Sequence, residues 1–233
     1  MQNQKDYRMN NTLLSIYETL YTRYGDLQWW PAKTVYEVMV GAVLTQNTAW
    51  TNVEKALANF TANPNNPDNR NNLTPEFVLS ADIAELVDII RPAGFFNQKA
   101  VYLKTMTEWF AEYNFDAQAV QKHALEKVRR ELLAVKGIGK ETADSILLYA
   151  FEFPTFVVDA YTVRFFERYS IDIGKSYDAI KAYCEENLPR DVYLYNNFHA
   201  LIVINGKNHC RKKPVCTGCP LENECKKDTL TQN

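Results

Sequence analysis

Helical spacing of apolar residues along almost the whole chain is the feature that most restricts its fold. Leu13, Ile16 and Leu20 lie three and four residues apart, and comparable spacing recurs as far as the segment 193–206. Such spacing puts apolar side chains on one face of a helix. Only 8 of the 233 residues are glycine, and alternating runs of β-branched residues are few. The sequence therefore predicts an all-α fold.

About ten helices are expected, joined by short polar or proline-containing turns. Thr74 and Pro75 together form a helix start, a cap followed by proline in the first turn. The Asn- and Pro-rich stretch 63–73 is expected to be a surface connection, and 153–158 to be extended. The expected helices cover residues 13–21, 35–44, 50–60, 74 onward, 81–90, 99–113, both sides of 135–139, 160–169, 177–188 and 193–206.

Charge and hydropathy limit the class of protein. A net charge of −2 and a pI near 6.0 argue against a nonspecific nucleic-acid coat protein, but they allow a local basic face. The longest apolar runs, such as 38–44, fall short of the roughly 20 residues that span a membrane. The first six residues are polar and lack an apolar signal region. We expect a soluble, cytoplasmic protein without a membrane partner.

A tight turn with two glycines, 135–139, separates two expected helices. Gly137 and Gly139 allow backbone conformations closed to other residues, and they leave backbone N–H groups bare for a phosphate oxygen. An ordinary glycine-capped helix–helix turn is the alternative. The candidate DNA-binding residues are Lys136, Gly137, Ile138, Gly139, Lys140 and Thr142.

A single carboxylate follows this turn at the end of an apolar stretch. Asp159 comes 20 residues after Gly139, behind Val157 and Val158. It is suited to capping the helix expected from Ala160, and that structural role is compatible with a catalytic one, since a cap pins the side chain.

The glycine turn and the downstream Val-Asp together resemble the helix-hairpin-helix superfamily of base-excision DNA glycosylases, over nearly the whole chain. The resemblance implies that Asp159 is the catalytic carboxylate, which stabilises the cationic sugar as the base departs. It implies double-stranded DNA with a damaged base as partner, and a monomer associated with a prokaryotic nucleoid. It also implies two helical domains, a six-helix domain 33–148 with the hairpin and a second domain 1–32 plus 149–233 with the segment 210–225, with Asp159 at the cleft between them.

Glu141 marks a departure from the bifunctional endonuclease III branch, whose hairpin pattern Gly-X-Gly-X-Lys-Thr-Ala carries a nucleophilic lysine at this position. A carboxylate cannot form the Schiff base needed for strand cleavage. Lys140 is one residue early, about 100° around the helix. The resemblance thus implies a monofunctional glycosylase with water as nucleophile. Glu141 is a second candidate catalytic residue that contacts the flipped nucleotide; a simple helix-start acid is the alternative.

Three longer strings, 29–31, 44–48 and 91–100, resemble the 3-methyladenine DNA glycosylase III group, which shares the hairpin glutamate. That likeness implies that Trp29 and Trp50 stack on the extruded base, with Trp30 and Pro31 as the pocket wall. Tryptophan suits a cationic alkylated purine, because cation–π contacts contribute up to about 2 kcal/mol when desolvated. The alternative is that the tryptophans only pack the core.

Two polar residues complete the substrate-binding candidates. Gln46 corresponds to a superfamily glutamine that fills the gap left in the duplex, or else it is a buried capping amide. Lys207 corresponds to a pocket-side lysine, or else it contacts a surface phosphate. The stretch 97–99 is a further candidate for contact with the DNA backbone.

Four of the five cysteines close the chain with the spacing Cys210-x5-Cys216-x2-Cys219-x5-Cys225. In a reducing cytosol such a cluster indicates a metal site. The pattern resembles the endonuclease III cluster loop, which has six residues in its first gap instead of five. We expect a [4Fe-4S] cluster in loop 210–225 that serves as a folding staple, with zinc as the alternative. Cys184 is expected in the core.

The sequence therefore predicts a monofunctional DNA glycosylase of base excision repair, acting on alkylated purines such as 3-methyladenine. The enzymatic alternatives are a mismatch glycosylase for uracil or thymine opposite guanine and an endonuclease III-like glycosylase/lyase. A noncatalytic, structure-sensing DNA-binding protein is the alternative outside enzymes.

Overall fold

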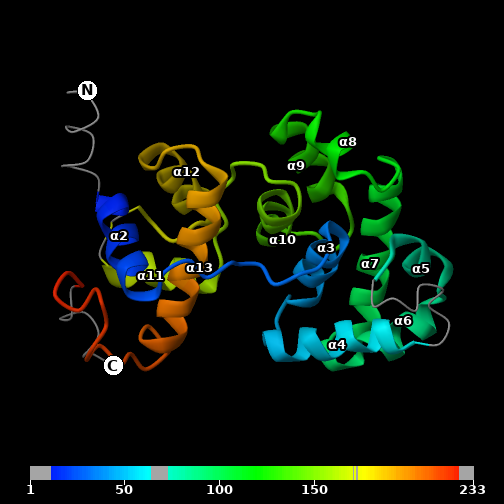
Figure 1. Cartoon of the computed structure of the whole chain (residues 1–233), viewed down its shortest axis with the longest axis horizontal. Helices are drawn as coiled ribbons and strands as arrows, with labels where there is room; N and C mark the ends of the chain where they lie inside the picture. The colour runs from blue at the N-terminus through cyan, green and yellow to red at the C-terminus, as the bar shows by residue number, and fades with distance from the viewer. Residues whose placement is uncertain (1–11, 64–72, 170, 172, 226–233) are drawn as a thin grey trace. The chain divides into compact units, whose positions relative to one another are not determined.

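The computed structural model describes residues 12–63, 73–169, 171 and 173–225, and every regular element within these ranges is a helix (Figure 1). The predicted all-α fold class is confirmed. The chain divides into two compact units, unit 1 formed by Met1–Trp29 with Pro154–Asn233 and unit 2 formed by Trp30–Phe153. The surface connection expected at 63–73 lies almost wholly outside the described residues.

Unit 2 is a continuous stretch of chain. Threonine side chains cap two of its helices. Thr74 accepts a hydrogen bond from the backbone of Phe77, as predicted, and Thr34 accepts one from the backbone of Glu37. Its helices are α3 (Val35–Leu44), α4 (Trp50–Ala62), α5 (Pro75–Ser80), α6 (Ile83–Ile90), η1 (Arg91–Ala93), α7 (Phe96–Ala111), α8 (Ala117–Gln121), α9 (Leu125–Ala134), α10 (Lys140–Ser145) and the π-turn η2 (Ile146–Ala150).

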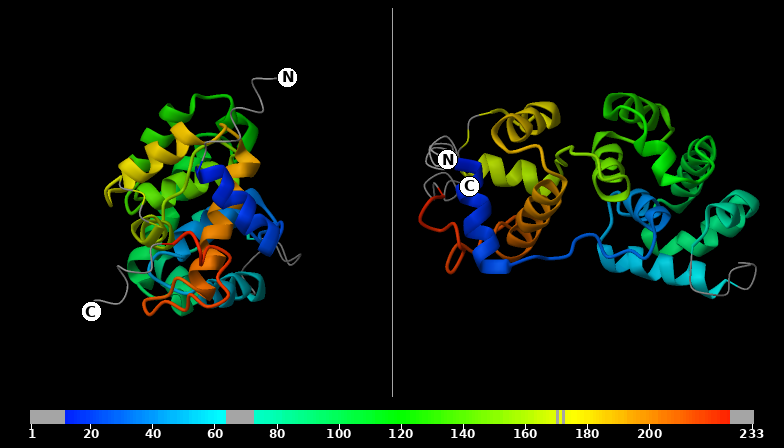
Figure 2. Two further views of the ribbon diagram at one scale, coloured as in Figure 1. Left: turned by 90° about the vertical axis from the view of Figure 1, so that its left-hand side faces the viewer. Right: turned by 45° about the horizontal axis from the view of Figure 1, so that its top comes forward.

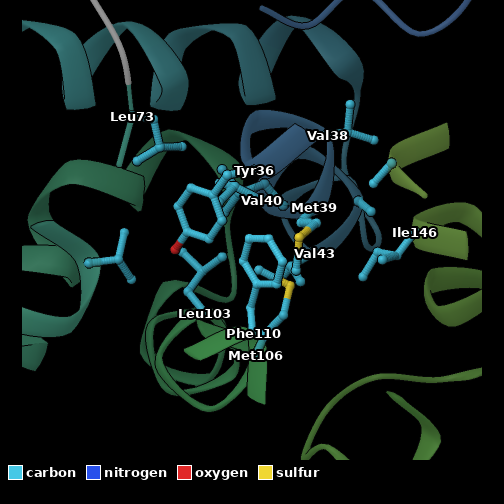
Figure 3. Packing of buried hydrophobic residues seen from close by; sticks show 14 of the residues in the cluster. Tyr36, Val38, Met39, Val40, Val43, Leu73, Leu103, Met106, Phe110 and Ile146 are labelled. Atoms are coloured by element: carbon cyan, nitrogen blue, oxygen red, sulfur yellow. The ribbon is translucent and has the colours of Figure 1, made fainter. Parts of the chain in front are cut away.

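The core of unit 2 forms around α3, which is apolar on nearly all sides and buried along most of its length. Figure 3 shows Met39 and Val43 of α3 close to Met106 and Phe110 of α7. Tyr36 stacks on Phe110 with ring centroids 6.3 Å apart, and its hydroxyl forms a hydrogen bond with the hydroxyl of Thr107. Full burial of each such side chain contributes about 1.5–3 kcal/mol.

Unit 1 combines an N-terminal helix with the C-terminal part of the chain. Its helices are α2 (Thr12–Tyr24), α11 (Ala160–Tyr169), α12 (Tyr177–Asn187) and α13 (Val192–Asn208), and α13 packs against both α2 and α11 (Figure 2). A Cβ atom on Gly206 of α13 would lie 2.5 Å from the ring of Tyr161 in α11, so these two helices approach closely. The residues after α13, through Cys225, form turns.

The unit boundaries differ slightly from the expected ones. Trp30 packs on Trp50 and Tyr149, and the backbone N–H of Phe153 donates to Leu147, so both ends of unit 2 extend past the expected limits of 33 and 148. The sequence reading also missed the short α8 and the π-turn. No helix in the described part of the chain is both long and apolar enough to cross a membrane.

Candidate active site and nucleic-acid interface

Asp159 stands in unit 1 where an extended segment meets the start of α11. Glu185 of α12 fixes that segment, because its Oε1 accepts hydrogen bonds from the backbone of Phe156 at 2.8 Å and from the hydroxyl of Thr155 at 3.3 Å. Asp159 Oδ1 then accepts from the backbone N–H of Thr162 at 2.7 Å and from its hydroxyl at 2.9 Å. The carboxylate is thereby held in one orientation as the cap of α11.

The second carboxylate oxygen of Asp159 faces a histidine that the sequence reading did not single out. Nε2 of His199, a buried residue of α13, lies 3.7 Å from Oδ2. Burial alone would raise the pKa of Asp159, but the imidazole of His199 and the hydrogen bonds from Thr162 outweigh it and hold the pKa below its ordinary value. Asp159 is therefore an ionised, oriented carboxylate at neutral pH, suited to stabilising a nearby cation.

Trp29 lies in the same unit, in the loop after α2. Asp26 ties this loop to α13, since its carboxylate accepts hydrogen bonds from the side chains of Asn197 and Tyr193, each at 3.1 Å. Lys207 Nζ lies 5.6 Å from the centroid of the Trp29 ring. Trp29 and Lys207, both predicted to bind substrate, thus contact each other. The cation over the Trp29 ring is the ammonium group of Lys207 and not a substrate.

The glycine turn in unit 2 has the predicted form, with α9 and α10 on either side of residues 135–139. Gly137 has a φ of +86°, and a Cβ atom there would lie 2.2 Å from the ring of Tyr102. Around Gly139, by contrast, a Cβ atom would meet nothing within 4 Å. The fold therefore requires glycine at 137 but leaves the space beside 139 open.

The side chains of this hairpin divide into outward-facing and inward-facing ones. Lys136, Lys140 and Glu141 are exposed, and Glu141 occupies the first turn of α10. Ile138 and Thr142 are buried, so any DNA contact they make passes through the backbone. The three exposed residues are the ones whose side chains can reach a ligand from outside.

Gln46 is attached to the hairpin. Its Nε2 donates hydrogen bonds to the carbonyl of Gly137 and to the hydroxyl of Thr142, both at 3.0 Å. Gln46, which is partly buried, thus links its own turn to the hairpin through its side-chain amide. A gap-filling role requires Gln46 to exchange these two bonds for contacts with DNA.

Trp30, Trp50 and Pro31 gather in unit 2. The Trp30 ring contacts Trp50 edge-on, with centroids 5.2 Å apart, and packs on Tyr149 at the same distance. Trp50 and Pro31 line a cavity of about 290 Å³, and the Trp50 indole N–H donates to Glu54 at 3.1 Å. Trp30 packs on Trp50 but is not among the residues that line this cavity, while Trp29, the other proposed stacking residue, belongs to unit 1.

The stretch 97–99 differs from its predicted role at one position. Lys99 is buried, and its Nζ donates to the carbonyls of Leu44 and Ala93, so it does not contact the DNA backbone. Asn97 and Gln98 are exposed, and so is Phe95 just before them, which is 62% exposed and has a left-handed φ of 47°. An aromatic residue directly after glycine was the only signal for it in the sequence.

The cysteine-rich segment contacts α13 and α11 of its own unit. The thiol of Cys219 lies 3.8 Å from the side chain of Asn205 in α13, and that of Cys225 lies 3.7 Å from the carbonyl of Arg168 in α11. Burial, and after it the neighbouring thiols of Cys210, Cys219 and Cys216, raise the pKa of Cys225 to about 11. No three metal-binding side chains among the described residues are grouped closely enough to hold a metal ion.

Cys184 is buried in α12, as expected, away from that segment in the sequence, and burial raises its pKa.

The candidate residues are thus shared between the two units. Asp159, Trp29, Lys207 and the four cysteines belong to unit 1, while the hairpin, Gln46 and the Trp30–Trp50 pair belong to unit 2.

Known proteins match the chain over most of its length. A model of the HhH-GPD superfamily of base excision DNA repair proteins matches residues 40–190. A Methanocaldococcus jannaschii protein, whose name assigns it provisionally to the DNA repair glycosylases, is 45% identical over 91% of this chain and 95% of its own. Endonuclease III of Sulfolobus acidocaldarius is 29% identical over 83% and 82% of the two chains.

Solved structures agree with the sequence comparisons. The 3-methyladenine DNA glycosylase MagIII of H. pylori, solved with bound 1,N6-ethenoadenine, matches with a TM-score of 0.70 and 29% identity, over 84% of this chain and 97% of its own. An endonuclease III–DNA complex, 19% identical, has a TM-score of 0.75 over 93% and 95% of the two chains and shows the shared fold. The chain belongs to the HhH-GPD superfamily of base excision DNA repair proteins.

Proposed function

We propose that the chain is a monofunctional DNA glycosylase that hydrolyses the N-glycosidic bond of alkylated purines such as 3-methyladenine in double-stranded DNA. The observation that carries this proposal is the ionised carboxylate of Asp159, pinned by Thr162 through one oxygen and left with the other beside His199. Such a fixed charge is suited to a reaction whose transition state carries positive charge.

The reaction needs little else from the protein. The bond between C1′ and the purine nitrogen breaks, its electron pair leaves with the base, and an alkylated cationic base departs neutral. The positive charge that develops on the sugar is stabilised by Asp159. Water then adds to C1′ and releases a proton. Glu141 supports hydrolysis over lyase chemistry, because a carboxylate at that hairpin position cannot form a Schiff base with the sugar.

Trp50 is better suited than Trp29 to stack on a positively charged base. The indole N–H of Trp50 donates to Glu54, which places negative charge at the ring edge. On Trp29, Lys207 already lies over the ring, so a cationic base stacking on that face has to displace the lysine. We therefore expect Trp50 to be the main stacking surface for the charged purine.

The four C-terminal cysteines fit an iron–sulfur cluster as a donor set. Their thiols lie near enough to raise the pKa of Cys225, and a cation would reverse that effect by stabilising thiolates. The spacing of the four cysteines, which resembles that of the endonuclease III cluster loop, favours iron–sulfur over zinc. We propose that Cys210, Cys216, Cys219 and Cys225 hold a [4Fe-4S] cluster that stabilises the end of unit 1.

Base release from alkylated duplex DNA tests the proposed activity. We expect free 3-methyladenine to be detected by chromatography, and no covalent protein–DNA adduct to form under borohydride reduction. Release of uracil or thymine from mispairs with guanine, without release of alkylated purines, would identify a mismatch glycosylase instead. A borohydride-trapped adduct would show lyase chemistry and contradict the inference from Glu141.

Two glycine variants separate the folding role of the hairpin from its proposed phosphate contact. Gly137→Ala is expected to destabilise unit 2 by about 1–3 kcal/mol or more, because of its positive φ and the clash with Tyr102. Gly139→Ala is expected to cost less than about 1 kcal/mol, yet to weaken duplex binding, since its methyl group would occupy the space left for a phosphate. Thermal unfolding and fluorescence anisotropy measure the two effects; unchanged binding by Gly139→Ala would argue against a phosphate at that position.

A further inference from the structure

Lys99 is a buried cation without a buried anion. Its side chain is 1% exposed, and Nζ donates to the carbonyl of Leu44 at 2.8 Å and to the carbonyl of Ala93 at 2.9 Å. No carboxylate pairs with it among the described residues. Burial lowers the pKa of Lys99 to about 8. Because burying an ammonium group is costly, a neutral side chain of similar length would fill this space at lower cost unless the two hydrogen bonds matter.

The two carbonyls end different elements of unit 2. Leu44 is the last residue of α3, where an unsatisfied carbonyl and the negative end of the helix favour a cation. Ala93 is the last residue of η1. The backbone N–H of Lys99 also donates to the carbonyl of Phe95 at 3.0 Å. Lys99 therefore holds the end of α3 and both sides of the turn that follows η1.

Each carbonyl leads into an exposed turn with a strained residue. The first turn, residues 45–49, carries Gln46, and its Asn47 has a φ of 53°. The second, residues 94–95, carries the exposed Phe95 with a φ of 47°. Left-handed backbone at residues other than glycine persists only where the surroundings impose it. Lys99 is the one side chain that bonds next to both turns among the described residues.

The 45–49 turn is attached to the hairpin by Gln46, whose side chain donates hydrogen bonds to Gly137 and Thr142. Hydrogen bonds of Gln46 and Lys99 thus connect the hairpin, the 45–49 turn and the 94–95 turn in series. If the hairpin contacts the DNA backbone, the two turns are fixed relative to that contact. An exposed apolar ring such as Phe95 is then suited to enter the base stack, as apolar wedges do in other DNA-binding proteins.

We propose that Lys99 is a positioning residue that couples the 45–49 and 94–95 turns, so that Gln46 and Phe95 act on one duplex together when a base is unstacked. The proposal rests on the DNA glycosylase function proposed above. It gives the buried charge a role: a lysine is long enough to reach both carbonyls and has three N–H donors, whereas an apolar side chain fills the space and leaves the turns uncoupled.

Lys99→Met tests the coupling, with Lys104→Met as the matched control on the same helix. Like Lys99, Lys104 donates from Nζ to a backbone carbonyl, but to only one, that of Leu79, which lies outside both turns. The probe is a duplex with 2-aminopurine beside a stable abasic analogue, whose fluorescence rises when the base unstacks. At saturating protein we expect the fluorescence rise to be about ten-fold smaller for Lys99→Met, as loss of a charge-assisted hydrogen bond predicts. Lys104→Met is expected to match the wild type.

A merely structural role would change a different set of measurements. It would lower thermal stability and duplex affinity in both lysine variants while leaving the fluorescence rise at saturation unchanged. Coupling through the second turn further predicts that Lys99→Met adds little in a Phe95→Ala background. A full fluorescence rise in Lys99→Met, or additive losses in the double variant, would overturn the proposal.

Gly94→Ala keeps the proposal testable if Lys99→Met does not fold. Gly94 has a φ of +69° and a ψ of 166°, a conformation essentially restricted to glycine, and no atom lies within 4 Å of its would-be Cβ. The variant thus strains the second turn and spares the core. We expect the same loss of fluorescence rise, and a wild-type rise would overturn the coupling. Absence of unstacking and of base release by the wild type would overturn the proposed function itself.

Discussion

Asp159→Asn is expected to lower the rate of base release from alkylated DNA by about 10²–10³-fold or more, because it removes the fixed negative charge that stabilises the cationic sugar. The amide keeps one oxygen to accept the two hydrogen bonds from Thr162, so the cap of α11 is retained. Affinity for duplex DNA should remain close to that of the wild type. Single-turnover base release and fluorescence anisotropy on the same preparations measure both quantities.

Asp191→Asn is the matched control for that variant. Asp191 caps α13 in the same unit, where its side chain accepts from the backbone of Leu194 at 2.7 Å, as Asp159 does for α11. Both variants lose one capping carboxylate, but only Asp159 faces His199. Equal losses of base release in the two variants would assign Asp159 a capping role only.

Because the pKa of Asp159 is lowered by folding, its ionised form contributes stability above its ordinary pKa, and this contribution is lost as the pH falls.

Replacing Cys216 and Cys219 together by alanine is expected to abolish the visible absorption of the purified protein and to reduce its iron content from about four per chain to below one. Loss of the cluster removes the link between the C-terminal segment, α11 and α13, so the thermal midpoint of unit 1 should fall. Absorption spectra, elemental analysis and thermal unfolding measure these changes. If the purified wild-type protein were colourless and contained zinc, the iron–sulfur assignment would be wrong and the four cysteines would form a zinc site.

Cys184→Ala provides the control for the cysteine variants. Cys184 is buried in the core of unit 1, so its replacement leaves a small cavity and costs some stability. It should leave the visible absorption and the iron content unchanged. A loss of colour in Cys184→Ala would mean that absorption reports on the stability of unit 1 and not on the four C-terminal cysteines.

Local signals in the sequence predicted the elements well. Thr74 and Pro75 start α5, and the apolar run 35–44 is α3, because caps and helical periodicity act within a few residues of chain. The π-turn at 146–150 was missed, since nothing local distinguishes it from a continuing α-helix. The short α8 was missed because it has only five residues and one fully buried side chain.

The candidate site was predicted in its residues but not in its contacts. The sequence singled out Asp159, Gln46 and Lys207, yet gave no indication that they would meet His199, Gly137 and Trp29 respectively. These partners lie 40, 91 and 178 residues away along the chain. Pairings over such distances depend on how helices pack, and side-chain periodicity does not encode them. The same limit explains why Lys99, expected at the surface, is buried against two backbone carbonyls.

What the sequence by itself determined is the all-α fold class, the glycine turn, the single carboxylate after it and the superfamily, because each is written in residues close together or in motifs of fixed spacing. The tertiary structure decided which glycine the fold needs, since Gly137 has a positive φ and packs on Tyr102, whereas Gly139 has a negative φ and open space beside it. It also decided that Asp159 stays ionised and that Phe95 is exposed. Burial and charge–charge distance set those properties, and both exist only once the helices have packed.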